Sequence, residues 1–340
     1  MAAAICPPRA GPGCSPRSAG RPRGVAGHQQ GGPRWPASRT VTPGPVRGPV
    51  DVDAKGSEVT TANPVGLRPF TTVEELAPLL DLVVLADVRW WLDGSQGRDQ
   101  HLEATLPGAV YVDLDGDLSG PPTHEGGRHP LPTPEAFAAT LGRLGIGEDD
   151  VVVAFDHGPG IAPARLVWML RSLGQRAALL DGGLAAWDGP TAPGGARRAA
   201  TSRRAQPWPE ERLVDSAAVL ARVSDDADVV LLDARSADRF AGAGEEPGRA
   251  PKGHIPGARS APATENLDGG RLLAPEELRE RYAALGALEA PEVIAYCGSG
   301  VAACVDLLAL EELGVAGRLY PGSWSAWSAD PARPVATGTG

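Results

Sequence analysis

The sequence predicts an α/β protein with mainly parallel sheets, built from two copies of one domain. Short apolar runs alternate with helical patterns along the chain, and this alternation is typical of parallel sheets covered by helices. The second observation is an internal repeat, in which segments of the first half recur in the same order in the second half. The offsets between matched segments stay between 140 and 149 residues, which indicates a duplication.

The matched segments follow one another in a fixed order. Each copy begins with an apolar strand that ends in Asp-x-Arg, followed by a Pro-Gly-Ala turn. A helix that opens with Pro-Glu comes next, because proline is tolerated in the first turn and glutamate favours the helix dipole. The matched pairs are 83–90 with 229–236, 106–109 with 255–258, 133–145 with 274–286, 152–156 with 293–297, and 180–187 with 320–327, and further helices are expected at 162–173 and 302–313.

These repeats set the expected domain organisation. An N-terminal domain is predicted at 66–190 and a C-terminal domain at 212–333, joined by a linker at 191–211 that is rich in Pro, Ala and Arg. A chain of 340 residues is long enough for two such domains. Residues 1–62 show neither helical nor strand periodicity and are rich in Gly and Pro, so we expect a disordered basic tail there.

Charge separates the tail from the rest of the chain. Residues 1–50 carry seven Arg and no Asp or Glu, and the whole chain has a net charge of −10, which leaves −17 on residues 51–340. A translation start assigned too far upstream would explain the tail. The Arg-rich, acid-free composition also fits an organelle transit peptide, although the prolines disfavour the amphipathic helix of such peptides. The acidic remainder argues against a nucleic-acid or anionic-membrane partner.

Composition excludes two further classes of protein. No apolar run approaches the ~18 residues that a membrane-spanning helix needs. Four cysteines in 340 residues are too few for a disulfide scaffold. We therefore expect a cytoplasmic globular protein.

The segment at 293–304 (VIAYCGSGVAAC) carries the strongest chemical signal. A strand delivers Cys297 to a tight glycine-rich loop, and a helix follows. Glycines let backbone N–H groups turn toward one point, and the helix N-terminus adds partial positive charge there. Both effects favour an anionic sulfur, so the loop suits a thiolate and the persulfide that forms when the thiolate accepts sulfur. A buried structural cysteine is the alternative, and we interpret Cys304 as such a core residue.

Three motifs and the repeat together resemble the two-domain rhodanese-like sulfurtransferases. The motifs are CGSGVAA at 297–303, GHIPGA at 253–258 and DAR at 233–235, and the resemblance covers residues 66–333. It implies tandem rhodanese-like domains, each a mainly parallel sheet flanked by helices. The loop looks most like the 3-mercaptopyruvate branch of the family, because thiosulfate-specific members place Arg and Lys directly after the cysteine.

The resemblance also implies a set of substrate-binding residues. The family's substrate arginines lie in an Arg-Phe-x-Gly…Glu-Pro-Arg segment, which matches Arg239 and Arg249 here. Arginine suits this role because its planar guanidinium binds a carboxylate through two hydrogen bonds. This sequence departs from the pattern in the extra glycine before Arg249, and in Ala302, where the family has Thr. The loop residues expected at the substrate are Gly298, Gly300, Val301 and Ala302.

Two further catalytic residues are implied by the motif match. The family's mercaptopyruvate enzymes have a Ser and an Asp assigned to assist the cysteine, and these correspond to Ser299 and Asp115. Since Asp115 belongs to the first copy, it implies an interdomain cleft. His129 resembles a family position near the substrate, but it lies in a divergent loop and its role stays open. Asp156 stands in the first copy where Cys297 stands in the second, so we expect the first domain to be inactive.

These residues predict ping-pong sulfur transfer through a Cys297 persulfide. We expect 3-mercaptopyruvate as donor, a thiol, cyanide or a reduced protein dithiol as acceptor, and no cofactor or metal. The nearest alternative is the same reaction with thiosulfate, and the other is a non-catalytic sulfur carrier or regulatory module. Phosphatase chemistry needs an Arg six residues after the cysteine and is disfavoured because that position is Ala303.

Overall fold

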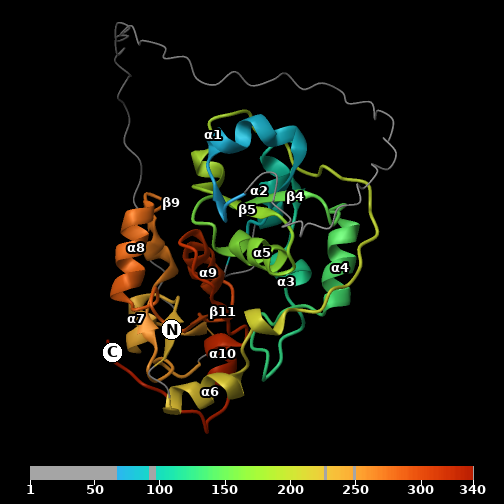
Figure 1. Cartoon of the computed structure of the whole chain (residues 1–340). Helices are drawn as coiled ribbons and strands as arrows, with labels where there is room; N and C mark the ends of the chain where they lie inside the picture. Colours follow the sequence, from blue (N-terminus) through green and yellow to red (C-terminus); the bar gives the residue numbers. More distant parts are fainter. Residues whose placement is uncertain (1–66, 92–96, 226–227, 248–249, 340) are drawn as a thin grey trace, which may run out of the picture. The chain divides into compact units, whose positions relative to one another are not determined.

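The computed structural model describes residues 67–91, 97–225, 228–247 and 250–339 (Figure 1). The tail predicted at 1–62 and the predicted substrate residue Arg249 lie outside the described residues. All of the described residues belong to one compact unit of the chain. Within these ranges, no helix has the length and apolar character that crossing a membrane requires.

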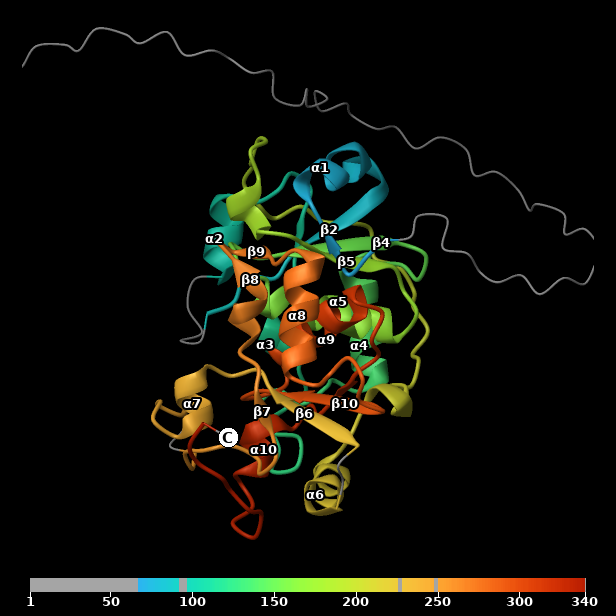
Figure 2. The same ribbon diagram turned by 60° about the vertical axis from the view of Figure 1, so that its left-hand side comes forward.

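The first sheet has five parallel strands in the order β1-β5-β4-β2-β3, of which β2, β4 and β5 are labelled in Figure 2. Its central strands pair in register from Val83 opposite Val151 to Asp87 opposite Phe155. The strands are β1 (Phe70–Thr71), β2 (Val83–Asp87), β3 (Val110–Tyr111), β4 (Val151–Phe155) and β5 (Ala177–Leu180). The helices of this half are α1 (Val73–Leu76), α2 (Gly97–Glu103), α3 (Leu114–Asp117), α4 (Pro134–Arg143) and α5 (Ile161–Ser172), with 3-10 helices η1 (Ala77–Leu82) and η2 (Gly183–Ala186).

The second sheet has four parallel strands in the order β11-β10-β6-β7. A separate antiparallel pair joins β8 and β9. The strands are β6 (Val229–Asp233), β7 (Arg259–Ser260), β8 (Leu267–Asp268), β9 (Arg271–Leu272), β10 (Glu292–Tyr296) and β11 (Arg318–Leu319). The helices are α6 (Ser216–Asp225), α7 (Ala237–Ala241), α8 (Pro275–Ala284), α9 (Ala303–Glu312) and α10 (Ser323–Trp327), with 3-10 helices η3 (Glu210–Arg212) and η5 (Ala263–Asn266).

The duplication predicted from the sequence is visible in the strand order. The order β5-β4-β2-β3 in the first sheet corresponds to β11-β10-β6-β7 in the second, and β1 is an additional edge strand of the first sheet. The predicted α/β class with parallel sheets is therefore confirmed. Because parallel sheets are covered on both faces, their strands appear in the sequence as continuous apolar runs.

The matched Pro-Gly-Ala segments form the same turn in both copies. The N–H of Ala109 donates to the carbonyl of Leu106 at 3.0 Å, and the N–H of Ala258 donates to that of Ile255 at 3.0 Å. The third residue of each turn, Gly108 or Gly257, has φ near +80°. A proline followed by a glycine at positive φ is the sequence pattern of a type II turn.

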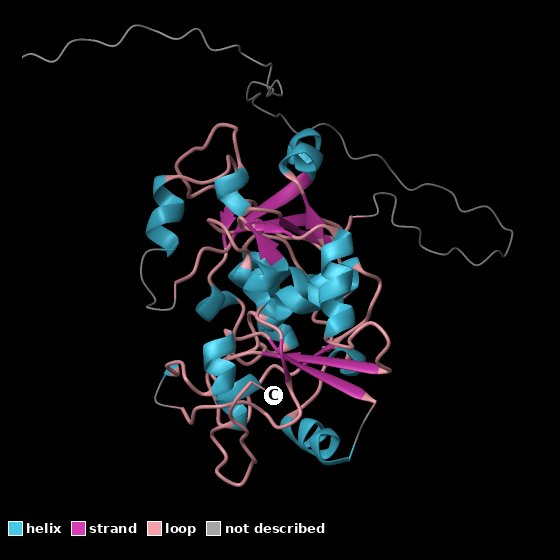
Figure 3. Cartoon of the chain, turned by 90° about the vertical axis from the view of Figure 1, so that its left-hand side faces the viewer, coloured by secondary structure: helices cyan, strands magenta, loops and turns pink. Residues whose placement is uncertain are grey.

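Helices α5 and α9 pack against each other within a core that takes side chains from both sheets. All residues of α5 from Ala162 to Leu170 are buried, as are those of α9 from Ala303 to Leu310. Helices that are buried on all sides carry apolar residues all round. The buried parts of both helices follow this rule except for one charged residue each, Arg165 in α5 and Asp306 in α9. Figure 3 shows these helices between the two layers of strands. Arg165 of α5 reaches the loop that precedes α9, where its Nη1 donates to the Gly300 carbonyl at 2.8 Å.

Candidate active site

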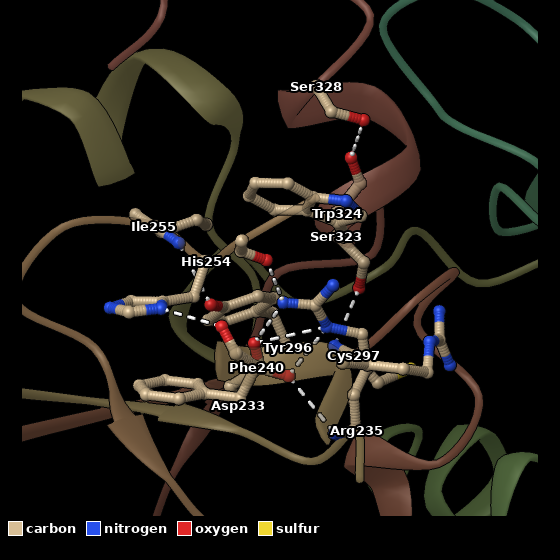
Figure 4. A network of polar contacts seen from close by, with 12 residues as sticks. Asp233, Arg235, Phe240, His254, Ile255, Tyr296, Cys297, Ser323, Trp324 and Ser328 are labelled. Carbon is tan, nitrogen blue, oxygen red and sulfur yellow. Dashed lines mark hydrogen bonds and ion pairs between the residues drawn. The ribbon is translucent and has the colours of Figure 1, made fainter. Parts of the chain in front are cut away.

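Cys297 lies directly after β10 and is 3% exposed. Its Sγ accepts a hydrogen bond from the Gly300 N–H at 3.1 Å, so the loop supports charge on the sulfur. The Cys297 N–H donates to Ser323 Oγ at 3.1 Å, and Figure 4 shows this contact beside the Cys297 side chain. Gly300 has φ +76°, and a Cβ there would lie 2.6 Å from the Pro321 carbonyl oxygen. This position therefore requires glycine.

The first turn of α10 holds the cysteine loop from outside. The N–H groups of Trp324 and Ser325 donate to the carbonyls of Cys297 and Gly298 at 2.9 and 3.0 Å. Ser323 has φ +51° and is the only non-glycine residue with positive φ among those described. The repeat places Gly183 of the first copy, with φ +55°, at the matching position. The strained backbone of Ser323 is compensated by its hydroxyl, which bonds the Cys297 N–H and the Tyr320 carbonyl.

Two arginines converge at Gly298, the residue after Cys297. A Cβ built on Gly298 would lie 3.0 Å from Arg239 Nη2 and 3.1 Å from Arg128 Nη2. Burial lowers the pKa of Arg128, and the neighbouring Arg239 lowers it further. Two facing cations in a half-buried position favour binding of an anion between them. Sequence reasoning predicted Arg239 but missed Arg128, which lies in the divergent loop of the first copy.

A chain of ion pairs holds Arg239 in place. Glu246 accepts from Arg239 Nε at 3.1 Å and Nη2 at 2.7 Å, and it also accepts from Arg235 Nη1 at 2.8 Å. Arg235 is in turn paired with Asp233 at the end of β6, as Figure 4 shows, and its guanidinium lies over the Trp324 ring at 4.6 Å. The side chains of Arg235 and Glu246 are nearly fully buried, so the carboxylate that binds Arg239 is held in a fixed position.

Ser299, His129 and Asp115 form a hydrogen-bonded chain across the two copies. Ser299 Oγ lies 2.7 Å from His129 Nδ1, and His129 Nε2 lies 2.9 Å from Asp115 Oδ1. Trp90 Nε1 donates to the other Asp115 oxygen at 2.9 Å. Burial lowers the pKa of His129, so its neutral form dominates near pH 7. With Nε2–H donating to the Asp115 carboxylate, Nδ1 is left to accept from the Ser299 hydroxyl.

The structure thus brings together most of the residues predicted from the sequence. Asp115 and Ser299 lie in one chain through His129, whose role the sequence left open. Val301 and Ala302 pack at the edge of the hydrophobic core, behind the loop. Cys304 is fully buried, its thiol donates to the Gly300 carbonyl, and burial raises its pKa to about 12. Arg249 lies outside the described residues.

The matching loop of the first copy has the same shape without a sulfur. Asp156 Oδ1 accepts hydrogen bonds from the N–H groups of Gly158 at 2.8 Å and Gly160 at 3.0 Å. Burial raises the pKa of this carboxyl. The loop has therefore kept its inward-facing amides, and a side-chain oxygen occupies the place that the sulfur has in the second copy.

Comparison with known proteins agrees with this geometry. A rhodanese-like domain matches residues 72–189 and again residues 216–330. The chain belongs to the rhodanese-like family. A "Probable 3-mercaptopyruvate sulfurtransferase" of Pseudomonas aeruginosa is 44% identical over 78% of this chain and 97% of that protein. The "Thiosulfate/3-mercaptopyruvate sulfurtransferase 1, mitochondrial" of Arabidopsis thaliana is 32% identical over 82% of this chain and 79% of that protein.

Solved rhodanese-like structures give the same result. The crystal structure of the 3-mercaptopyruvate sulfurtransferase from Escherichia coli superposes with a TM-score of 0.67 at 32% identity, covering 76% of this chain and 99% of that one. The family and the sulfurtransferase class that the sequence predicts are therefore confirmed.

Proposed function

We propose that this rhodanese-like protein takes a sulfane sulfur from 3-mercaptopyruvate onto Cys297 and passes it to a thiol acceptor or to cyanide. The observation that carries this choice of donor is the hydrogen-bonded chain of Asp115, His129 and Ser299, which ends two residues from the cysteine. A buried hydroxyl held by a neutral imidazole can polarise a carbonyl oxygen. 3-Mercaptopyruvate has a carbonyl next to its reacting carbon, whereas thiosulfate has none.

The donor's carboxylate is assigned to the pair of arginines at Gly298. Arg128 and Arg239 present their Nη2 atoms to the same point in front of the loop. Glu246 already compensates part of the Arg239 charge, so the pair retains net positive charge toward solvent. We also retain Arg249 as a proposed second contact on the same segment. A carboxylate bound there leaves the donor's sulfur close to Cys297 and its keto oxygen toward Ser299.

The first half-reaction is a transfer between sulfur atoms. The Cys297 thiolate attacks the donor's sulfur and forms an S–S bond, while the C–S bond of the donor breaks and its electron pair passes to carbon. The Ser299 hydroxyl, which donates its single proton to His129 Nδ1 in the resting site, turns that proton to the enolate oxygen and so stabilises the enolate. The proton of the donor's thiol passes to the enolate carbon, so pyruvate leaves and an anionic persulfide remains on Cys297. The Gly300 N–H bonds the inner sulfur in both states.

The second half-reaction restores the thiolate. An acceptor thiolate or cyanide attacks the outer sulfur of the persulfide, and the S–S electron pair returns to Cys297. The assignment of residues 212–333 as the catalytic domain and of residues 66–190 as a supporting domain follows from Cys297 and Asp156. A cytoplasmic location, and the lack of a nucleic-acid or membrane partner, stay predictions from composition.

Mass spectrometry of the intact protein tests the proposal. After incubation with 3-mercaptopyruvate and removal of the donor, we expect one added sulfur atom on the wild type and none on Cys297→Ser. No adduct on the wild type, or an adduct on the variant, would contradict the assignment.

Thiosulfate is the second candidate donor, because two adjacent arginines also suit a dianion and a relative's name includes both donors. Ser299→Ala separates the two. We expect kcat with 3-mercaptopyruvate to fall by about 10²-fold, since one hydrogen bond to the developing oxyanion is lost. Turnover of thiosulfate should change less than about twofold, since no oxyanion develops on that substrate. Equal losses with both donors, or a strong preference for thiosulfate in the wild type, would favour the second candidate.

A further inference from the structure

Arg165 is a fully buried cation that the proposed mechanism does not yet use. It belongs to α5 of the first copy and is 0% exposed. Its Nη1 donates to the Gly300 carbonyl at 2.8 Å and its Nη2 donates to the His129 carbonyl at 3.1 Å. Its Nε has no hydrogen-bond partner among the described residues. One guanidinium thus contacts both the cysteine loop and the segment that carries the imidazole.

Arg165 also lacks the partner that a buried charge usually has. Within the described ranges no carboxylate forms an ion pair with it, whereas the other buried arginines, Arg89 and Arg235, each bind an aspartate. A buried charge is costly unless it is paired. Burial lowers the pKa of Arg165, and the groups that oppose this are the sulfur atoms of Cys304 and Cys297. An arginine nevertheless stays protonated in a protein.

Only one of these two sulfur atoms is available as an anion. Burial raises the pKa of Cys304 to about 12, so its thiol is neutral near pH 7 and donates to the Gly300 carbonyl. Cys297 is therefore the group near Arg165 that can supply negative charge, either as a thiolate or as a persulfide.

The duplication shows that this cation is specific to one copy. After Gly160 and Gly300 the two copies align with an offset of 140, so Val305 occupies in the second copy the position of Arg165 in the first. Asp156, in the loop of the first copy, fills the space among its own loop amides. The copy without the cysteine thus supplies the arginine, and the copy with the cysteine has an apolar residue instead.

We propose that Arg165 is a positioning residue that supplies the permanent countercharge for the anionic sulfur of Cys297 and fixes the cysteine loop relative to His129. The proposal rests on the function assigned above. Arg165 contacts the cysteine loop at the Gly300 carbonyl, whereas Arg128 and Arg239 lie at Gly298. Glu246 neutralises part of the charge of Arg239, and a donor carboxylate would neutralise Arg128. Of these three arginines, Arg165 is then the one whose charge no carboxylate balances while the persulfide forms.

The charge of Arg165 also acts on the imidazole. Arg165 contributes to the lowering of the pKa of His129, after burial and together with Arg128, and Asp115 opposes it. Removing the cation should therefore take a countercharge from the anionic sulfur of Cys297 and let His129 accept a proton at higher pH. A role limited to packing would change neither the reactivity of Cys297 nor the pKa of His129.

The test compares Arg165→Met and Arg165→Gln with Arg171→Met as the matched control. Arg171 lies on the same helix and joins the two copies through Glu311 of α9 at 2.7 Å, away from the cysteine loop. The readout is alkylation of Cys297 by iodoacetamide over a range of pH, followed by mass spectrometry of its peptide, which needs no sulfur donor. The buried Cys304 is the internal reference, because its thiol is neutral and inaccessible until the protein unfolds.

For Arg165→Met we expect alkylation of Cys297 at pH 7 to be about tenfold slower than in the wild type, because the anionic sulfur loses a countercharge. The control should stay within about twofold of the wild type. If Arg165→Met does not fold, Arg165→Gln decides, since it keeps a donor for the Gly300 carbonyl but has no charge. A folded variant with the wild-type alkylation profile would overturn the proposal for Arg165. A wild type that alkylates normally but never accepts sulfur would instead overturn the proposed function.

Discussion

His129 decides how the site responds to pH. Burial lowers its pKa below the usual 6.5, so its neutral form persists into weakly acidic solution. We expect kcat/KM with 3-mercaptopyruvate to stay constant from pH 8 to below pH 6.5 and then to fall, because an imidazolium has no lone pair to accept the Ser299 hydroxyl. Steady-state rates measured across this range locate the fall.

Asp115→Asn tests the same chain through its outer member. The carboxylate opposes the lowering of the His129 pKa, so its removal should move the fall in kcat/KM to still lower pH. The maximal rate should drop by about 10²-fold, because the tautomer that accepts from Ser299 is no longer fixed. An unshifted profile in this variant would show that His129 is not the group that titrates. Glu135→Gln, an exposed carboxylate at the start of α4, is a suitable control.

Residues within the cysteine loop could be predicted from the sequence, whereas those that reach it from elsewhere could not. Cys297 and Ser299 are part of a local glycine-rich pattern whose geometry follows from strand, turn and helix. Arg128 and His129 meet the loop from about 170 positions earlier in the chain, in a segment with no motif. Glu246 and Arg165 were missed because their role depends on what surrounds them after folding. Whether a charged residue is buried depends on the tertiary structure, so the local sequence does not show it.

At the scale of elements, α9 contains a carboxyl that makes stability depend on pH. Asp306 Oδ1 accepts from Asn266 Nδ2 at 2.6 Å and from the Tyr282 hydroxyl at 3.0 Å, and burial raises the pKa of Asp306 to about 7. The pKa of Asp306 in the folded protein is above the ordinary value of 3.8. The stability that this carboxyl contributes is therefore complete below about pH 3.8 and is lost as the pH rises toward about 7.

Asp306→Asn should remove this dependence. The wild type should lose about 2 to 3 kcal/mol of unfolding free energy between pH 5 and pH 8 from this group, and the variant should not. Urea denaturation at the two pH values, with the exposed Asp268→Asn as control, measures the difference. If the unfolding free energy changes equally with pH in the wild type and in Asp306→Asn, the pH dependence does not come from this buried carboxyl.

The elements predicted from the sequence were those with a strong pattern. The expected helices at 162–173 and 302–313 correspond to α5 (Ile161–Ser172) and α9 (Ala303–Glu312), because a buried apolar run bounded by glycines defines both ends. The hairpin of β8 and β9 was not predicted, since strands of two residues carry no alternation. The edge strand β1 has no counterpart in the other sheet, so the repeat could not indicate it.

At the scale of the whole molecule, the two copies share one interior although the sequence predicts two domains. The buried cluster around α5 and α9 takes residues from both sheets, and the ion pairs of Arg171 with Glu311 and of Arg68 with Glu312 join the copies at its edge. The repeat could not show this, because each copy could bury its own sheet independently. The first copy has Asp156 where the second has Cys297, and it places Asp115, His129, Arg128 and Arg165 around the cysteine loop.

A shared interior predicts that the two copies unfold together. We expect a single calorimetric transition, because exposing α5 would also expose α9 and would uncover the face of each sheet that packs against these helices. Cys304 reports on the same event, since it is fully buried on α9 and should be alkylated only when the interior opens. The denaturant midpoints from circular dichroism and from Cys304 labelling should then coincide. Two separate transitions, or Cys304 labelling before the loss of helical signal, would mean that each copy is stable alone and that the site is assembled by docking of two independent domains.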